Sequence, residues 1–397
     1  MEASIAQSDL RDLTRLFAER TRGDVGGAIA EILALAGRDD VISFAGGLPD
    51  ATTFPRDELA AIFTELDARA FQYAPTEGLA TTRDFLRTWI GKGQGAAPEP
   101  TELLVTSGGM EALELISKAI VEDGDVVAVE GPTYVGGIMA FRAFGASVVA
   151  LRIDDRGLDV AELESALRGG LRPKLLYTIP EHQNPAGVSL AAERRAPLVE
   201  LARRHGFLIV EDVAYRELGF AAAPAPSLWS IAPDVVVQVG TFSKTFMPGT
   251  RLGWACGPRE VIAQLVWAKQ TTDQCASPLA QRLLEEYGRR GLLDAGIERA
   301  RTVYARRWRA LNAAFERSMP DGVEWTRPSG GFFTWVTLPD GDAAQLARVA
   351  IDRGVAYVAG EFFFPDGRGR RNARVSFSVV DEGEIDEGVA RLAAVFA

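Results

Sequence analysis

The chain has 397 residues, 47% of them hydrophobic, which is enough to bury a large core and predicts two domains. Its formal net charge of -11 argues against nucleic-acid binding, which requires a basic face. The sequence contains no run of eighteen apolar residues, so no membrane span is predicted. Two cysteines and two histidines argue against a disulfide framework, a metal site or triad chemistry. The two unpaired cysteines and an N-terminus that lacks a signal-peptide core predict a cytoplasmic protein.

The first 50 residues are expected to form an N-terminal arm and helix that join the smaller domain. Residues 12–35 have a helical pattern and lead to a loop in which Gly46 and Gly47 precede Pro49.

Residues 51–290 are expected to form the larger domain. Short apolar, β-rich runs alternate there with amphipathic stretches, a pattern typical of an α/β fold with a mostly parallel, doubly wound sheet between helices. The expected strands are 103–106, 126–129, 147–151, 175–179, 207–210, 235–239 and 252–256. The expected helices include 110–121, 135–143, 191–205 and 258–270.

The pattern changes near residue 290, and residues 291–397 are expected to form a smaller α+β domain. A long arginine-rich helix over 292–319 precedes short β segments at 332–338 and 374–377, and a helix over 383–396 ends the chain.

Lys244 is the residue that carries the most chemical information. It is one of only five lysines among 43 basic residues, it follows Thr241 and Ser243, and Arg251 lies seven residues further on. A lysine amine can condense with an aldehyde, while hydroxyl and guanidinium groups beside it hold a dianionic phosphate. Pyridoxal 5'-phosphate carries both groups, so this segment predicts that cofactor.

A glycine turn, Gly108-Gly109-Met110, separates an expected strand from an expected helix. Glycines there let backbone N–H groups approach an anion, and the helix N-terminus adds a partial positive charge. An ordinary tight turn would have the same pattern, so both interpretations stay open.

Polar side chains also follow the expected strands, where a doubly wound sheet collects its ligands. Asp212 can pair with a pyridine nitrogen and keep it protonated, or it can cap the next helix. Asn184 and Tyr215 can hydrogen-bond the 3'-oxygen of such a ring, and Tyr134 can stack on its face. Arg374 can hold a substrate α-carboxylate through two parallel hydrogen bonds, or it can be one of many surface arginines.

Taken in order, these motifs resemble the fold-type I pyridoxal-phosphate aminotransferases of class I/II. The closest likeness is to the branch that contains 2-aminoadipate and kynurenine/2-aminoadipate aminotransferases. The segments that carry the resemblance are 43–49, 72–78, 183–187, 241–244 and 328–333, which span nearly the whole chain.

The resemblance implies a role for each of these residues. Lys244 would bind the cofactor covalently and then act as base and acid, Asp212 would pair with the ring nitrogen, and Arg374 would bind the α-carboxylate. The cofactor would also be held by a further set of residues, which comprises Gly108, Gly109, Met110, Tyr134, Asn184, Tyr215, Ser243 and Arg251. Asn184 would bind the α-carboxylate together with Arg374, and Gly46 and Gly47 would line the substrate side. Tyr73 would reach the phosphate of a neighbouring subunit, which implies a homodimer with shared sites.

Two positions depart from the related enzymes. Gly109-Met110 stands where many of them have Ser-Gln, so a hydroxyl and an amide are lost while backbone contacts are kept. The segment around Gly26-Gly27 is glycine-rich where relatives that take acidic or kynurenine-like substrates carry arginine, which leaves recognition of the distal substrate group open.

The predicted reaction is ping-pong transamination between an α-amino acid and a 2-oxo acid through pyridoxamine phosphate. A decarboxylase, lyase, cyclase or oxidase acting on an amino acid with the same cofactor is the main alternative. A transcription regulator of the GntR superfamily is disfavoured, because only about forty residues precede Gly46 and the chain is acidic.

Overall fold

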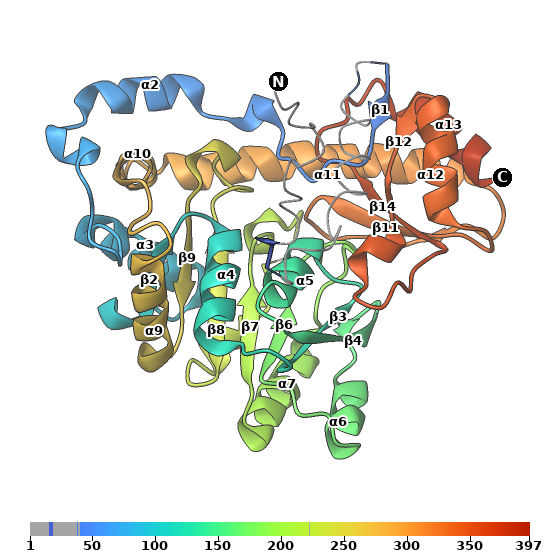
Figure 1. The fold of residues 1–397 in the computed structure, drawn as a ribbon. Helices are drawn as coiled ribbons and strands as arrows, with labels where there is room; N and C mark the ends of the chain where they lie inside the picture. Colours follow the sequence, from blue (N-terminus) through green and yellow to red (C-terminus); the bar gives the residue numbers. More distant parts are fainter. Residues whose placement is uncertain (1–15, 19–37, 39, 222) are drawn as a thin grey trace, which may run out of the picture.

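The computed structural model describes residues 16–18, 38, 40–221 and 223–397 (Figure 1). Most of the helix predicted over 12–35, including Gly26-Gly27, lies outside the described residues.

An eight-stranded sheet forms the centre of the molecule, with the strand order β2-β9-β8-β7-β6-β3-β4-β5. Strands β8, β7, β6, β3 and β4 run parallel, while β9 is antiparallel to both of its neighbours and β5 turns back on β4. The strands are β2 Leu103–Thr106, β3 Val126–Gly131, β4 Ser147–Asp154, β5 Gly157–Leu158, β6 Leu175–Thr178, β7 Leu208–Asp212, β8 Val236–Thr241 and β9 Gly253–Cys256. The predicted α/β class with a mostly parallel sheet is therefore confirmed.

Alternation along each strand divides the core between the two faces of this sheet. In β6, Leu175 and Tyr177 pack into one hydrophobic cluster, whereas Leu176 between them packs into the other. Successive side chains of a strand point to opposite faces, so a continuous apolar run such as this one is buried on both sides.

Helices cover both faces of the sheet, as the alternating pattern predicted (Figure 1). They are α2 Arg56–Glu65, α3 Ala80–Gln94, α4 Gly109–Ile120, α5 Val135–Arg142, α6 Val160–Arg168, α7 Ala192–His205, α8 Leu228–Ile231, α9 Arg259–Gln270 and α10 Pro278–Arg289. None of the described helices is long and apolar enough to cross a bilayer.

The C-terminal part of the chain builds a separate antiparallel sheet with the order β10-β11-β14-β13. Its strands are β10 Glu324–Trp325, β11 Phe333–Thr337, β13 Val358–Ala359 and β14 Asn372–Ser376, and its helices are α11 Leu292–Ser318, α12 Ala343–Asp352 and α13 Ile385–Phe396. The long helix α11 crosses above the central sheet in Figure 1 and reaches this second sheet.

The segment before the glycine loop joins the C-terminal part of the chain. β1 (Ile42–Ser43) pairs in parallel with β12 (Val355–Ala356). Arg307 of α11 forms an ion pair with Asp50 and hydrogen-bonds the carbonyl of Ser378, whose hydroxyl donates to the carbonyl of Leu48 at 2.6 Å. The Gly46-Gly47 loop is thus fixed to the C-terminal sheet and helices.

Candidate active site

The predicted phosphate turn and the predicted lysine loop meet because of strand pairing. Gly253 at the start of β9 lies opposite Thr106 of β2 on one side and Thr241 of β8 on the other. Gly108 follows β2, and Lys244 follows β8, so both loops leave the sheet at the same end as Arg251, which precedes β9.

Gly108 and Arg251 are in close contact. Gly108 has a φ of +98°, and a Cβ added there would lie 2.8 Å from a terminal guanidinium nitrogen of Arg251. A side chain at this position would therefore be strained and would displace the guanidinium. Arg251 also donates to the Ser243 hydroxyl at 3.4 Å. The turn, the arginine and the serine together form a cradle of donors at the N-terminus of α4, where an anion is favoured.

Lys244 contacts the glycine loop. Its Nζ donates to the carbonyl of Gly47 at 2.8 Å and lies 5.7 Å from the ring centroid of Phe332. Burial, together with the positive charge of Arg374, lowers the pKa of Lys244 to about 8, although the carboxylate of Asp212 opposes this shift. A larger fraction of this amine is therefore uncharged, and hence nucleophilic, at neutral pH than for an exposed lysine.

This pKa predicts the pH dependence of the cofactor-free protein. The uncharged fraction rises as the pH increases through about 8 and is nearly complete well below the ordinary lysine pKa of 10.5. We expect the second-order rate of pyridoxal phosphate uptake, corrected for titration of the free aldehyde, to rise with a midpoint near pH 8 and then level off. A midpoint near 10.5 would contradict the burial of this amine.

Asp212 is the last residue of β7 and is buried. Its carboxylate accepts hydrogen bonds from the Tyr177 hydroxyl at 2.8 Å and from the backbone N–H of Ala214 at 3.0 Å. Burial raises the pKa of Asp212, although its two hydrogen bonds and the positive charge of Lys244 favour the ionised form. Among the described residues no salt bridge to Asp212 occurs, and the next helical turn, Arg216–Leu218, is not capped by this side chain. The helix-cap alternative is therefore wrong.

Arg374 is a buried residue of β14, so the surface-arginine alternative is also wrong. Its guanidinium carbon lies 4.3 Å from the ring centroid of Phe333 and 4.9 Å from that of Phe363. Its terminal nitrogens donate to Asn184 Oδ1 at 3.0 Å and to the carbonyl of Ala45 at 2.8 Å, while its Nε has no hydrogen-bond partner. Burial lowers the pKa of Arg374 to about 10, so the side chain stays cationic at neutral pH.

The remaining predicted residues are placed around these groups. A Cβ on Gly47 would lie 2.8 Å from the Phe333 ring and 3.9 Å from Arg374, so the glycine loop contacts the buried arginine. Tyr215 packs edge-on against Phe333, with ring centroids 5.8 Å apart. Burial raises the pKa of Tyr134, and the charge of Asp212 raises it further.

The loop that carries Asn184 is held by a buried carboxylate. Gln183 donates to Glu130 at 3.0 Å and to the carbonyl of Pro132 at 2.7 Å, and its own oxygen accepts from Ala186 N–H at 2.8 Å. Burial raises the pKa of Glu130 to about 7. The hydrogen bonds of Gln183 hold the loop in place, so the side chain of Asn184 is left to bond Arg374.

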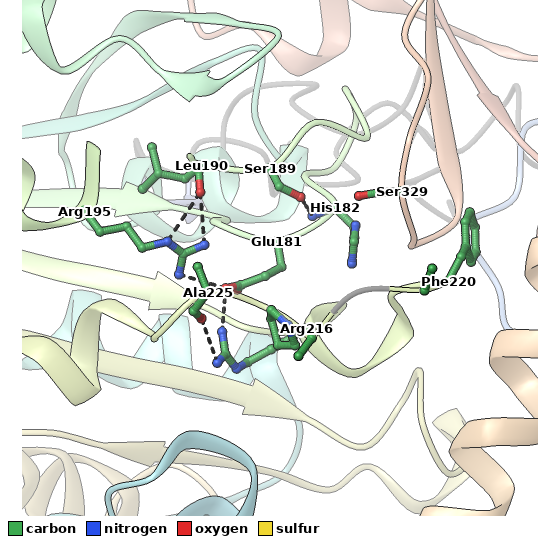
Figure 2. A pocket seen from close by; sticks show the side chains of 12 residues that line it. Glu181, His182, Ser189, Leu190, Arg195, Arg216, Phe220, Ala225 and Ser329 are labelled. Carbon is green, nitrogen blue, oxygen red and sulfur yellow. Dashed lines mark hydrogen bonds and ion pairs between the residues drawn. The ribbon is translucent and has the colours of Figure 1, made fainter. Parts of the chain in front are cut away.

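A second cluster supports the same loop from the other side, around a cavity of about 320 Å³ (Figure 2). Glu181 accepts from Arg195 at 2.9 Å and from Arg216 at 2.5 Å, and both arginines also donate to backbone carbonyls. His182 is buried beside them with its pKa lowered to about 4 by burial, so it is uncharged at neutral pH. This cluster stabilises the loop.

Comparison with known proteins identifies the family. The family model described as aminotransferase class I and II matches residues 39–392. The chain belongs to this family.

Similar proteins with known names lie within the family. An aromatic-amino-acid aminotransferase of Thermococcus litoralis is 38% identical over 96% of this chain and 94% of its own length. A 2-aminoadipate transaminase of Thermus thermophilus is 39% identical over 92% of both chains. A solved kynurenine aminotransferase of Pyrococcus horikoshii, in complex with pyridoxamine phosphate (PMP), matches with a TM-score of 0.93 and 37% identity over 98% of both chains. These relatives support transamination over the alternative reactions.

The cofactor of this aminotransferase is pyridoxal 5'-phosphate, and the residues present fit it. The buried Asp212 carboxylate accepts hydrogen bonds from Tyr177 and Ala214 but forms no ion pair among the described residues, and a pyridinium would supply that partner. The close approach of Gly108 and Arg251 leaves backbone and guanidinium donors for a phosphate. The amine of Lys244 is buried near both groups, since the charges of Asp212 and Arg251 act on its pKa.

The structure also contains residues of this site that the sequence patterns did not single out. Tyr177 holds Asp212, Phe333 and Phe363 enclose Arg374, and the carbonyl of Ala45 accepts from the same arginine. Tyr177 is the last residue but one of β6, so the rule that ligands collect near the ends of strands was a usable signal for it.

Proposed function

We propose that this aminotransferase transfers the amino group of an α-amino acid to a 2-oxo acid, with Lys244 as the catalytic base and acid. When bound, pyridoxal phosphate supplies the aldehyde that receives the amine and the ring that accepts the electrons of the broken Cα–H bond. The observation that carries the proposal is the convergence of an amine with a lowered pKa, a buried carboxylate and a buried guanidinium from three different elements.

Each protein group has a separate task in this proposal. Lys244 Nζ would take a proton from the substrate α-carbon and return it to the aldehyde-derived carbon of the cofactor, on the other side of the amino nitrogen, and the carbonyl of Gly47 holds the amine in reach. Asp212 keeps the ring nitrogen protonated, with Tyr177 orienting it. Asn184 and Tyr215 bind the ring oxygen, Tyr134 stacks on the ring, and the amides of Gly108, Gly109 and Met110 bind the phosphate together with Ser243 and Arg251.

Arg374 is proposed to bind the α-carboxylate that all substrates share. The Nε hydrogen and the unused hydrogens of its terminal nitrogens form a planar fork between two aromatic rings, which suits bidentate recognition. Gly47 leaves room beside it, since any side chain there would meet Phe333.

Arg374→Lys keeps the charge but loses the fork. We expect the KM for the amino acid to rise about 10- to 100-fold, the scale of a hydrogen bond to a charged group. Steady-state kinetics measure this rise, and Arg371→Lys, an exposed arginine that donates to the carbonyl of Pro339, is the matched control. Equal KM values for Arg374→Lys and the unmodified enzyme would remove Arg374 from substrate binding.

The proposed unit is a homodimer with shared sites in the cytoplasm. Tyr73 is 79% exposed, and Phe71 and Leu48 are also exposed, so these groups are available to a second copy of the chain. The two free cysteines suit a reducing compartment. The proposed division into residues 51–290 and 291–397, with 1–50 joining the latter, places Lys244 and Arg374 in different domains.

Half-reaction stoichiometry tests the proposed function. The loaded enzyme mixed with a panel of single amino acids should release one 2-oxo acid for each cofactor converted to pyridoxamine phosphate, and a second 2-oxo acid should restore the starting spectrum. Release of carbon dioxide or ammonia, or uptake of oxygen, in place of that stoichiometry would establish one of the alternative reactions. Sedimentation of the same sample measures the oligomeric state.

A further inference from the structure

Ser107, the residue before the phosphate turn, is held by two carboxylates. Its backbone N–H donates to Glu111 at 2.5 Å, and its hydroxyl donates to Asp273 at 2.5 Å. Both donors of Ser107 are therefore used within the protein. This serine orients the turn that follows it and has no donor left for a phosphate.

Lys269 joins the two carboxylates. Its side chain has no exposed surface, and its Nζ lies 2.7 Å from both oxygens of Glu111 and 2.7 and 2.9 Å from those of Asp273. An ammonium this deeply buried requires such partners, and removing one partner leaves a charge uncompensated. The position of Lys269 therefore depends on both carboxylates, and theirs depends on Lys269.

The cluster links two parts of the chain that are far apart in sequence. Glu111 lies in the first turn of α4, directly after the phosphate turn, whereas Lys269 lies in the last turn of α9 and Asp273 follows that helix. The two helices pack against each other. The cluster thus fixes the N-terminus of α4, whose free amides face the proposed phosphate position, to the C-terminal end of α9.

We propose that Ser107, Glu111, Lys269 and Asp273 form a positioning network that holds the Gly108-Gly109-Met110 turn ready for a phosphate dianion and so makes the protein select the phosphorylated form of its cofactor. The proposal rests on the phosphate role of this turn given under the proposed function. None of these four side chains is among the residues proposed to bind the aldehyde or the ring of the cofactor. The network is therefore expected to contribute only to the affinity for the phosphate.

Comparing pyridoxal phosphate with pyridoxal tests the network. Pyridoxal carries the same aldehyde and ring without the phosphate. Its affinity therefore measures the contacts to the aldehyde and the ring and leaves out those between the turn and the phosphate. We expect Glu111→Gln and Lys269→Met to weaken pyridoxal phosphate binding to the cofactor-free protein by about tenfold or more, the scale found for residues that orient ligating groups. The dissociation constant of pyridoxal should stay within about twofold of its original value, because no bond to the phosphate is involved.

Further variants keep the test decisive. Ser107→Ala removes only the bond to Asp273 and should weaken pyridoxal phosphate binding about two- to tenfold even if Lys269→Met fails to fold. Lys174→Met breaks a partly exposed lysine–aspartate ion pair with Asp125, away from the site, and should change neither affinity. Unchanged pyridoxal phosphate affinity in Glu111→Gln and Ser107→Ala, or equal weakening for both aldehydes, would overturn the network. Failure of the unmodified protein to bind pyridoxal phosphate would instead overturn the proposed function.

Discussion

Lys244→Ala is expected to lower the rate of transamination by about 10²- to 10⁴-fold or more, because the variant loses the group that transfers the proton. The amine is buried and placed by the carbonyl of Gly47, and its pKa of about 8 lets it act as a base near neutral pH. The other four lysines are held by other partners. Lys92 pairs with Asp294, Lys118 bonds Thr271 and Thr272, Lys174 pairs with Asp125, and Lys269 pairs with Glu111 and Asp273. Single-turnover measurements with the loaded variant separate this loss from weaker cofactor binding.

Two controls make this result specific to Lys244. Lys174→Ala, which removes a half-exposed lysine paired with Asp125, should keep the original rate. Added ammonia or methylamine should restore part of the rate to Lys244→Ala, since a small amine can occupy the space left beside Gly47. A Lys244→Ala protein that transaminates within a few-fold of the original rate would refute its role as base.

Asp212→Asn should lower kcat by about 10²- to 10³-fold, the scale of losing one preorganised electrostatic partner. The amide keeps the shape and can still interact with Tyr177, but it cannot supply the negative charge that holds a protonated ring nitrogen. Asp212→Glu should retain more activity than Asp212→Asn, because it keeps the charge.

The matched control for this substitution is Asp125→Asn, which removes a carboxylate from a surface ion pair. We expect its kcat to be unchanged, since exposed ion pairs contribute little. If Asp212→Asn were as active as Asp125→Asn, the buried carboxylate would have no part in activating the ring.

Much of the fold was predictable because the central strands are short apolar runs that alternate with amphipathic helices. Strand β6, predicted over 175–179, forms over Leu175–Thr178, and α9, predicted over 258–270, forms over Arg259–Gln270. The short strands β12 and β13 were not predicted, because two-residue strands carry no periodic signal and depend on their partners in the sheet.

The motifs supplied the candidate residues of the site but not the contacts that support them. Arg374 was one arginine among many in the sequence, and only the packing of Phe333 and Phe363 on its two sides shows that it is buried. The bond from Tyr177 to Asp212 joins neighbouring strands, so it depends on a register that spacing alone does not give. The distal substrate question at Gly26-Gly27 stays a prediction, because those residues lie outside the described ones.

The most direct test of the central claim is borohydride reduction of the purified enzyme loaded with pyridoxal phosphate, followed by peptide mass mapping. Reduction fixes the cofactor to the amine that binds it. We expect one phosphopyridoxyl group per chain, on the peptide that contains Lys244. A cofactor fixed to Lys92, Lys118, Lys174 or Lys269, or no fixed cofactor, would contradict this expectation.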